Sequence, residues 1–269
     1  MPELPEVFTI SEDLKKILPN SVLENVEIIE KYRSIPETSE FSKILNTKVK
    51  EVSRISKYIL ITFENSLTLL FHLGMTGRIR YSETSKDFGW DKIKLQFSNE
   101  GRNFFINFTD TRKFGKVKIL NEVKINTGTE VFNLTSKEKE NIVIKISKKN
   151  TEIKNILLDQ KVISGLGNIY SNDTLFDAKV NPLKKGNELS ENQIGKIIDS
   201  AKKILEKGIK LKGSSLKDKM YTDIFGNYGK YQDHFLVYNQ EFCRECNSKL
   251  NKVYIKQRSS YYCPTCQVF

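Results

Sequence analysis

The sequence predicts an α+β protein: an N-terminal β-sandwich with a leading helix, a helical domain, and a C-terminal hairpin built around cysteines. Short segments that alternate apolar and polar residues fill the chain up to about Asn121, and beyond it the apolar spacing becomes helical. All four cysteines lie in the last 27 residues. A chain of 269 residues is long enough for two domains, or for one domain with an appended module.

The individual elements follow from the same patterns. Val7, Ile10 and Leu14 recur at helical spacing, which predicts a helix from about Pro5 to Leu18. Eight strands are expected at 22–30, 48–55, 57–64, 66–74, 77–83, 92–98, 103–110 and 116–120. Four helices are expected at 134–146, 151–160, 168–178 and 190–208. The polar, glycine-rich stretch 211–229 is expected to form a mobile loop.

Composition limits the class of protein. Hydrophobic residues make up 38% of the chain and charged residues 29%, which is ordinary for a folded, water-soluble protein. We find no apolar run of about 18 residues and no signal-peptide pattern, so we expect an intracellular, cytoplasmic protein without a membrane partner. Lys and Arg number 44 against 33 Asp and Glu, a formal charge of +11. That excess favours nucleic acid as a partner, although a generally lysine-rich composition explains it equally well.

The cysteines form two tight pairs. Two residues separate Cys243 from Cys246, sixteen residues follow, and Cys263 and Cys266 repeat the spacing. Two such pairs can place four thiolates on one tetrahedral ion, which predicts a structural zinc site with no open coordination position. An iron–sulfur site or two redox pairs are the alternatives. The basic and aromatic residues between the pairs fit either a DNA contact or a solvated edge.

The amino terminus offers a nucleophile that is partly unprotonated at neutral pH. An α-amino group has a pKa near about 8, roughly two units below that of lysine. After removal of Met1, Pro2 presents a secondary amine whose adduct with a sugar carbon is a cationic iminium, and this cation promotes elimination of a phosphate. Glu3, Glu6 and Lys57 are candidates for proton transfer. Proline and glutamate also suit the first turn of an ordinary helix, so this segment alone leaves catalysis open.

Five motifs in order extend this hypothesis along nearly the whole chain. They are MPELPEV at the start, HLGMTGR at 72–78, DTRKFG at 110–115, DQKVISGLGNIY at 159–170, and the terminal CREC and RSSYYCPTCQ. Together they closely resemble the formamidopyrimidine-DNA glycosylases. The resemblance implies an N-terminal catalytic β-sandwich domain at 1–125, a helix-two-turns-helix DNA-binding domain with a lesion-capping loop at 126–232, and a zinc-finger hairpin at 233–269.

The resemblance also implies a role for each matched residue. Pro2 looks like the Schiff-base nucleophile and Glu3 like the essential acid and base, whereas Glu6 looks like a lesion-recognition residue. Lys57 and Arg258 resemble the two basic catalytic residues that are assigned to the elimination steps.

A further set resembles the family's DNA contacts. Met75, Arg112 and Phe114 resemble the side chains that fill the space left by a flipped nucleotide; for Met75 and Phe114 the alternative is a place in the core. The other members of the set are Trp90, Lys149, Lys154 and Asn168. Trp90 stands where the family commonly has a histidine, and Asp173 where a glutamate is usual.

The function that this resemblance implies is a bifunctional DNA glycosylase and AP lyase. Such an enzyme excises oxidised purines, including 8-oxoguanine and formamidopyrimidines, from damaged duplex DNA through a Schiff base at Pro2. It then nicks the strand by β,δ-elimination, acts as a monomer, and carries one structural zinc ion. An endonuclease VIII-like enzyme for oxidised pyrimidines and a noncatalytic zinc-ribbon DNA-binding protein are the alternatives, and HLGMTGR and DTRKFG favour the purine-directed enzyme.

Overall fold

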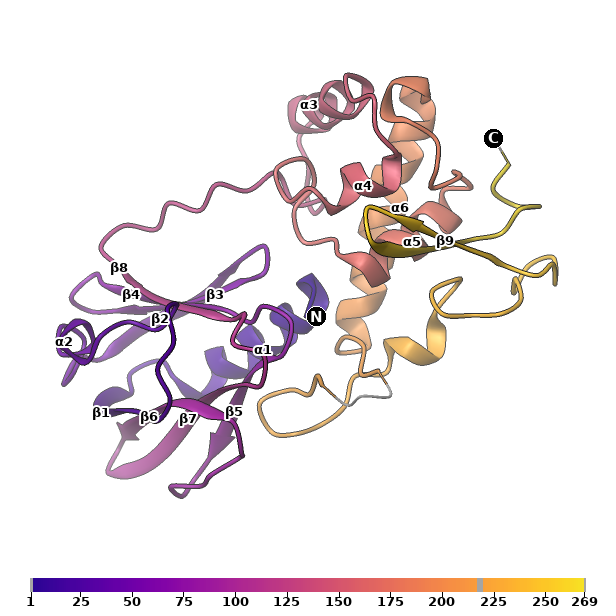
Figure 1. Cartoon of the computed structure of the whole chain (residues 1–269). Coiled ribbons are helices and arrows are strands. Elements are labelled where there is room, and N and C mark those ends of the chain that lie inside the picture. The colour runs from indigo at the N-terminus through magenta and orange to yellow at the C-terminus, as the bar shows by residue number, and fades with distance from the viewer. Residues whose placement is uncertain (1, 217–219, 269) are drawn as a thin grey trace. The chain divides into compact units, whose positions relative to one another are not determined.

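The computed structural model describes residues 2–216 and 220–268 (Figure 1). The chain divides into two compact units, the first formed by 1–125 with 211–230 and the second by 126–210 with 231–269. The segment 211–230, expected to belong to the helical domain, therefore belongs to the first unit. The reason is that its apolar side chains Tyr221 and Ile224 are part of the hydrophobic core of that unit.

The first unit begins with helix α1 (Leu4–Ile17). Glu3 is its N-cap residue, and Glu3 and Glu6 form a reciprocal capping box that satisfies backbone N–H groups of the first turn. The apolar face of the helix, with Val7, Ile10 and Leu14, is buried and packs against β2 and β3. Burial of this face fixes the position of the amino terminus in the unit.

Two antiparallel four-stranded sheets form the rest of the first unit, so the predicted β-sandwich is confirmed (Figure 1). One sheet has the order β1 (Val22–Ile28), β6 (Asp91–Asn99), β7 (Arg102–Asp110) and β5 (Gly77–Ser82). The other has the order β2 (Val49–Ile55), β3 (Tyr58–Phe63), β4 (Thr68–His72) and β8 (Lys116–Leu120). A short helix, α2 (Thr38–Phe41), follows β1.

The hydrophobic core of the first unit joins the two sheets. Phe71 of β4 and Phe108 of β7 come from different sheets, and their ring centroids are 5.6 Å apart. Buried apolar residues from every strand surround them. The alternation that the sequence displays in 57–64 and 103–110 thus turns one face of each strand toward a shared interior.

The second unit is the predicted helical domain with the cysteine hairpin. Its helices are α3 (Ser136–Ser147), α4 (Ile153–Leu158), α5 (Asn168–Asp177) and α6 (Glu191–Lys210), with short 3-10 turns η1 (Gly186–Glu188) and η2 (Tyr231–His234). Strands β9 (Asn251–Ile255) and β10 (Arg258–Tyr262) form the hairpin, and β10 packs against α5 (Figure 1). In the part of the chain that the structure describes, the helices lack the combined length and apolar character that a membrane span requires.

Candidate functional site

The start of α1 brings three of the expected site residues together. Pro2, Glu3 and Glu6 are all buried. The Glu6 carboxylate accepts a hydrogen bond from Glu3 N at 2.8 Å through Oε2, and one from Ser214 N at 2.7 Å through Oε1. One carboxylate therefore links the candidate catalytic residue Glu3 to the segment 211–230. The expected removal of Met1 concerns a residue outside the described part of the chain.

A close backbone approach allows this link. Gly213 has φ +78°, and a Cβ atom at this position would lie 2.8 Å from Glu6 Cγ and Oε1. Glycine is the residue that adopts this conformation readily and leaves room for the carboxylate. The sequence therefore allows the backbone of the expected capping loop to meet Glu6 directly.

Lys57 lies in the tight turn between β2 and β3, and its side chain is buried. Ser56 in the same turn has φ +55°, and its carbonyl accepts a hydrogen bond from Arg54 Nη1 at 2.6 Å. The Arg54 guanidinium also lies over the ring of Phe8 in α1, 5.8 Å from its centroid. Arg54 thereby ties the turn that carries Lys57 to the helix that carries Glu3.

His72, which closes β4, is a neutral side chain at physiological pH. Burial is the main cause that lowers its pKa to about 4, and the positive charges of Lys116 and Lys57 act in the same direction. Its ring pairs with that of Tyr58 across the two strands, with the centroids 4.9 Å apart. These contacts favour a structural role for His72.

Met75, Arg112 and Phe114 lie on two neighbouring loops, residues 73–76 and 111–115, which we call the wedge loops. Arg112 is exposed and Phe114 is 50% exposed, and the guanidinium lies 5.0 Å from the centroid of the phenyl ring. Met75 is half-buried. A phenylalanine that stays so exposed does not serve the core, which argues against the core alternative for Phe114.

Trp90 occupies a sharp turn at the start of β6. Its side chain is 67% exposed, its φ is +59°, and its carbonyl accepts a hydrogen bond from Asp110 N at 3.1 Å. The Lys92 ammonium lies 5.9 Å from the centroid of the indole ring. An exposed aromatic side chain beside a cation is suited to stacking on a base or sugar. Trp90, which replaces the histidine common in the family, is therefore suited to contact DNA.

Segment 211–230 is attached to strand β5 through residues that follow 217–219 in sequence. Residues 217–219 themselves lie outside the described part of the chain. Tyr81 N donates to Ile224 O at 2.9 Å, and the rings of Tyr81 and Phe225 make an edge contact at 5.5 Å. The Arg80 guanidinium donates to the Thr222 hydroxyl. The described residues of this segment form no regular helix or strand, yet Glu6 binds it at Ser214 and β5 binds it at Thr222 and Ile224.

In the second unit, Lys154 and Asn168 meet at the first turn of α5. The side chain of Lys154 is 0% exposed, and its ammonium donates to Asn168 O at 3.0 Å and to Ser171 Oγ at 2.8 Å. The ammonium thus holds the turn that carries Asn168, and the contact of Lys154 with DNA stays a prediction. Lys149 lies at the surface, where its ammonium pairs with Asp159 at 3.0 Å.

Hydrogen bonds connect α5 to the cysteine hairpin. Asn168 Nδ2 donates to Ser259 Oγ at 3.3 Å, and Tyr261 N donates to Asn172 Oδ1 at 2.8 Å. Arg258, the neighbour of Ser259, is exposed beside a two-residue turn in which both residues have positive φ. The structure therefore brings Asn168, an expected DNA contact, and Arg258, an expected catalytic residue, to one region of the second unit.

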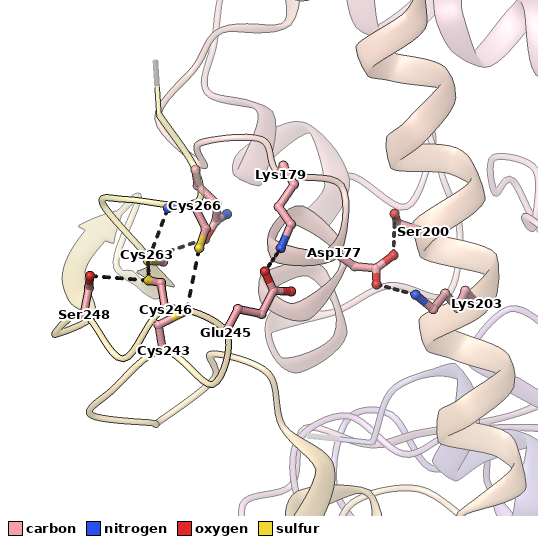
Figure 2. Close-up of polar contacts among 11 residues, drawn as sticks. Asp177, Lys179, Ser200, Lys203, Cys243, Glu245, Cys246, Ser248, Cys263 and Cys266 are labelled. Carbon is pink, nitrogen blue, oxygen red and sulfur yellow. Dashed lines mark hydrogen bonds and ion pairs between the residues drawn. The ribbon is translucent and has the colours of Figure 1, made fainter.

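The four cysteines form a cluster that can hold a metal ion (Figure 2). Their sulfur atoms lie within 4.8 Å of one another, with 3.9 Å between Cys243 and Cys266 and 3.4 Å between Cys246 and Cys263. A Zn–S bond of about 2.3 Å puts the sulfurs of a tetrahedron about 3.8 Å apart, so these residues fit a tetrahedral ion. Hydrogen bonding with Ser248 lowers the pKa of the Cys246 thiol to about 6, whereas burial raises that of Cys263.

A leading helix on a two-sheet sandwich, a helical unit and a four-cysteine hairpin define a class of protein that comparison with known sequences identifies. The profile of the formamidopyrimidine-DNA glycosylase N-terminal domain matches residues 1–117, and that of the H2TH domain of the same glycosylases matches 131–220. The formamidopyrimidine-DNA glycosylase of Pelotomaculum thermopropionicum is 34% identical over 99% of each chain, and that of Rickettsia africae is 33% identical over the same shares. The chain belongs to the formamidopyrimidine-DNA glycosylase family.

Solved structures agree with this assignment. The Fpg protein of Lactococcus lactis, in complex with DNA that contains an abasic site, is 28% identical and has a TM-score of 0.88 over 99% of both chains. A variant of that protein in complex with Fapy-dG-containing DNA has a TM-score of 0.90 over the whole of both chains. The helix-two-turns-helix assignment for the second unit is therefore confirmed.

Several residues that organise the site were given no role from the sequence. Asp110 was part of a quoted motif, and the signal that marks it is an acidic residue at the end of the apolar strand NFFINFTD. Asn172 and Ser259 carry no such signal. They are ordinary polar residues, and what makes them important is a hydrogen bond between them across 87 positions of the chain.

Proposed function

We propose that the protein is a bifunctional DNA glycosylase and AP lyase that acts on oxidised purines in duplex DNA. The observation that carries this proposal is the burial of Pro2 and Glu3 at the first turn of α1, where Glu6 fixes Glu3 and the segment 211–230. A buried acid beside a terminal secondary amine supplies both groups that amine-dependent base excision requires.

In the proposed reaction, the Pro2 nitrogen forms a bond to C1′ of the damaged nucleotide while the bond from C1′ to the base breaks. The base leaves with the bonding electron pair and takes up a proton. Ring opening of the sugar, with Glu3 as acid, gives an iminium at C1′. Loss of a proton from C2′ then expels the 3′ phosphate, a second elimination expels the 5′ phosphate, and hydrolysis of the iminium frees Pro2. Lys57 and Arg258 assist these two eliminations.

DNA is the proposed partner, supported by the +11 charge and by the DNA present in the solved complexes of the Lactococcus lactis protein. The exposed Phe114 and Arg112, together with Met75, are suited to fill the space left by a flipped base and to face its former partner. Asn168 and Arg258 in one region are suited to hold backbone phosphate, and Trp90 to stack on DNA. Lesion recognition falls to Glu6 and the segment 211–230.

Zinc is the proposed metal, with one ion per chain. The donor set is four sulfurs, which suits zinc and leaves no position for a reacting water molecule. When bound, the ion supplies structural stabilisation of the hairpin that carries Arg258. The residues that would hold it are Cys243, Cys246, Cys263 and Cys266.

Borohydride trapping tests the central step. The processed protein, with loss of Met1 verified by intact mass, is mixed with duplex DNA that contains 8-oxoguanine and is reduced. We expect a covalent protein–DNA adduct, because reduction fixes the iminium at Pro2. A form extended by a few residues before Pro2 serves as the control and is expected to give no adduct, and Pro2→Gly tests the need for the secondary amine.

The same assay separates the alternatives. An adduct with thymine glycol in place of 8-oxoguanine would move the substrate class to oxidised pyrimidines and leave the amine chemistry intact. No adduct and no nick with either lesion, from processed and metal-loaded protein that binds DNA, would contradict catalysis and leave a noncatalytic DNA-binding protein.

A further inference from the structure

Asp110 is a buried carboxylate that binds both wedge loops at once. Its side chain is 0% exposed at the end of β7. Oδ1 accepts a hydrogen bond from Thr76 Oγ1 at 2.5 Å and lies 3.2 Å from Arg112 N. Oδ2 accepts from Gly115 N at 2.7 Å and lies 3.3 Å from the Tyr32 hydroxyl. One residue therefore contacts the loop that carries Met75 and the loop that carries Arg112 and Phe114.

The two wedge loops also contact each other directly. The Thr76 hydroxyl donates to Asp110 and accepts from Arg112 N at 3.1 Å, so it lies between the two loops. Gly74 has φ +60°, and a Cβ atom there would lie 2.5 Å from the carbonyl carbon and oxygen of Phe114. The backbones of the two loops are therefore in close contact, with no space for a side chain at position 74.

The segment after β1 braces the second wedge loop from outside. The Tyr32 hydroxyl donates to Gly115 O at 2.9 Å. Glu30 forms ion pairs with Lys113, which lies between Arg112 and Phe114 in sequence, and with the buried Lys92. These pairs lower the pKa of Glu30 to about 2, so Glu30 keeps its negative charge over the whole physiological range.

We propose that Asp110 is a positioning residue that sets the spacing of Met75 from Arg112 and Phe114, and through it the efficiency of base extrusion. It contacts no DNA, because its carboxylate is buried and its oxygens are used by Thr76, Arg112 N and Gly115 N. Extrusion of a base costs a few kcal/mol of stacking and pairing. Side chains that are already ordered on two fixed loops offset that cost without first losing entropy of their own. This inference rests on the proposed wedge role of these three side chains.

The test compares two reactions of the same protein in single turnover. One is excision of 8-oxoguanine paired with cytosine, which requires extrusion of a stacked base, and the other is strand cleavage at a preformed abasic site in the same duplex. For Asp110→Asn, which keeps the size but removes one acceptor oxygen, we expect excision to slow by about 100-fold, as for misplaced reacting groups. Cleavage at the abasic site should change by less than about threefold, because no base has to leave the stack.

Thr76 provides a second test in case Asp110→Asn fails to fold. Thr76→Val removes the hydroxyl and is expected to slow excision selectively, whereas Thr76→Ser retains the hydroxyl and is expected to restore it. Thr62→Val is the matched control, since it removes a hydroxyl bonded to Thr68 at 3.1 Å in the same unit and away from the wedge loops. Equal loss of both reactions in Thr76→Val and Thr62→Val would overturn the proposal.

Phe114→Ala separates this proposal from the proposed function. If Phe114→Ala slows excision and Asp110→Asn does not, the positioning role is overturned and the wedge role stands. If Phe114→Ala leaves excision unchanged, the wedge role fails and the positioning role fails with it. If both slow excision, the double variant should be scarcely slower than Phe114→Ala alone, because a missing wedge cannot be misplaced further. If instead the effects of Asp110→Asn and Phe114→Ala on the excision rate add fully in the double variant, the result would count against the proposal.

Discussion

The two units hold their candidate functional side chains in different ways. In the first unit, Glu3, Glu6 and Lys57 are buried at the edge of one large hydrophobic core that includes the apolar face of α1. In the second unit, Arg258 is exposed on a hairpin with a small apolar cluster, and its position depends on hydrogen bonds to α5 and on the cysteine cluster.

This difference predicts that the two sets of side chains respond differently to local unfolding. Side chains fixed by a large core keep their geometry until the whole unit unfolds, as reacting groups require. Side chains on a small hairpin depend on a few polar contacts and a metal, so they can be released while the catalytic end stays folded. Perturbations of the second unit should therefore weaken DNA binding and spare the fold of the first.

Metal removal is the change with the largest expected effect. Structural zinc contributes about 10 kcal/mol or more of apparent binding free energy in small zinc domains, so the hairpin should unfold without it. We expect a chelator, or Cys246→Ser, to open the segment after about Asn239 to protease while the first unit keeps its thermal transition. Zinc addition should reverse the chelator effect, and Ser248→Ala should leave the segment protected. A metal-free hairpin that resists protease would contradict this dependence.

Replacement of Asp173 is expected to have the next largest effect. This fully buried carboxylate accepts hydrogen bonds from the Tyr231 hydroxyl at 2.9 Å and from Val237 N at 3.1 Å, which ties α5 to the chain that leads into the hairpin. Asp173→Ala leaves these donors unpaired and should lower the free energy of unfolding of the second unit by about 3 kcal/mol in urea titrations.

Asp177, on the same helix, offers the control for that measurement. Its carboxylate binds Ser200 Oγ at 2.8 Å and the Lys203 ammonium at 2.6 Å near the surface (Figure 2). Asp177→Ala should cost about 1 kcal/mol or less, since surface ion pairs are weak. Equal costs for the two substitutions would show that Asp173 does not have the anchoring role described.

The stability of the first unit should fall as the pH is lowered toward the pKa of His72. The folded state lowers this pKa to about 4 from an unfolded value near 6.5, mainly through burial. The unfolded state therefore binds the proton first, so stability is complete above about pH 6.5 and is lost as the pH falls to about 4. One pKa unit corresponds to about 1.4 kcal/mol, so the fall of this pKa from 6.5 to about 4 sets an upper limit of about 3.5 kcal/mol.

Urea unfolding at a series of pH values measures this loss. His72→Gln should flatten the profile between about pH 6.5 and 4, since it removes the titrating group. The exposed His234 is the other of the two histidines, and His234→Gln should leave the profile unchanged. If both variants keep the slope of the parent protein, carboxylates account for the acid sensitivity and His72 does not.

Local patterns were sufficient to predict the elements other than α2 and the two 3-10 turns. The eight strands and four helices follow from alternating and helical spacing, because most of these elements bury an apolar face. The cysteine spacing likewise predicted a cluster that the structure confirms. These features depend on residues close together in the chain, which is why the sequence displays them.

Contacts between distant segments were not predictable in the same way. Segment 211–229 is polar and rich in glycine, which predicts a loop, but its attachment to Glu6 and β5 depends on residues more than 100 positions away. The buried charge of Lys154 gives no signal in sequence, since lysine is usually exposed. The Asp110 contacts depend on how close the two wedge loops lie to each other in the fold, and the hydrophobic periodicity of the sequence carries no information on that distance.

The last comparison, and the most specific for the first unit, is between Gly213→Ala and Gly101→Ala. Gly213 and Gly101 have nearly equal φ values, +78° and +77°, so alanine costs a similar strain of about 1 kcal/mol at each position. At Gly101 the new methyl group meets no atom within 4 Å, whereas at Gly213 it meets Glu6 at 2.8 Å. The Glu6 carboxylate must then move away from Ser214 N and Glu3 N.

The two variants should therefore differ in both stability and activity. Gly101→Ala should lose only the small free energy of its backbone strain, whereas Gly213→Ala should lose more, because Ser214 N and Glu3 N lose their acceptor. Only Gly213→Ala should slow excision of 8-oxoguanine, by about tenfold or more, since it displaces a group that organises the proposed catalytic residues. The comparison is sharp because the two substitutions share their backbone strain and differ in one contact. Equal excision rates in Gly213→Ala and Gly101→Ala would mean that the link from Glu6 to segment 211–230 does not govern the reaction.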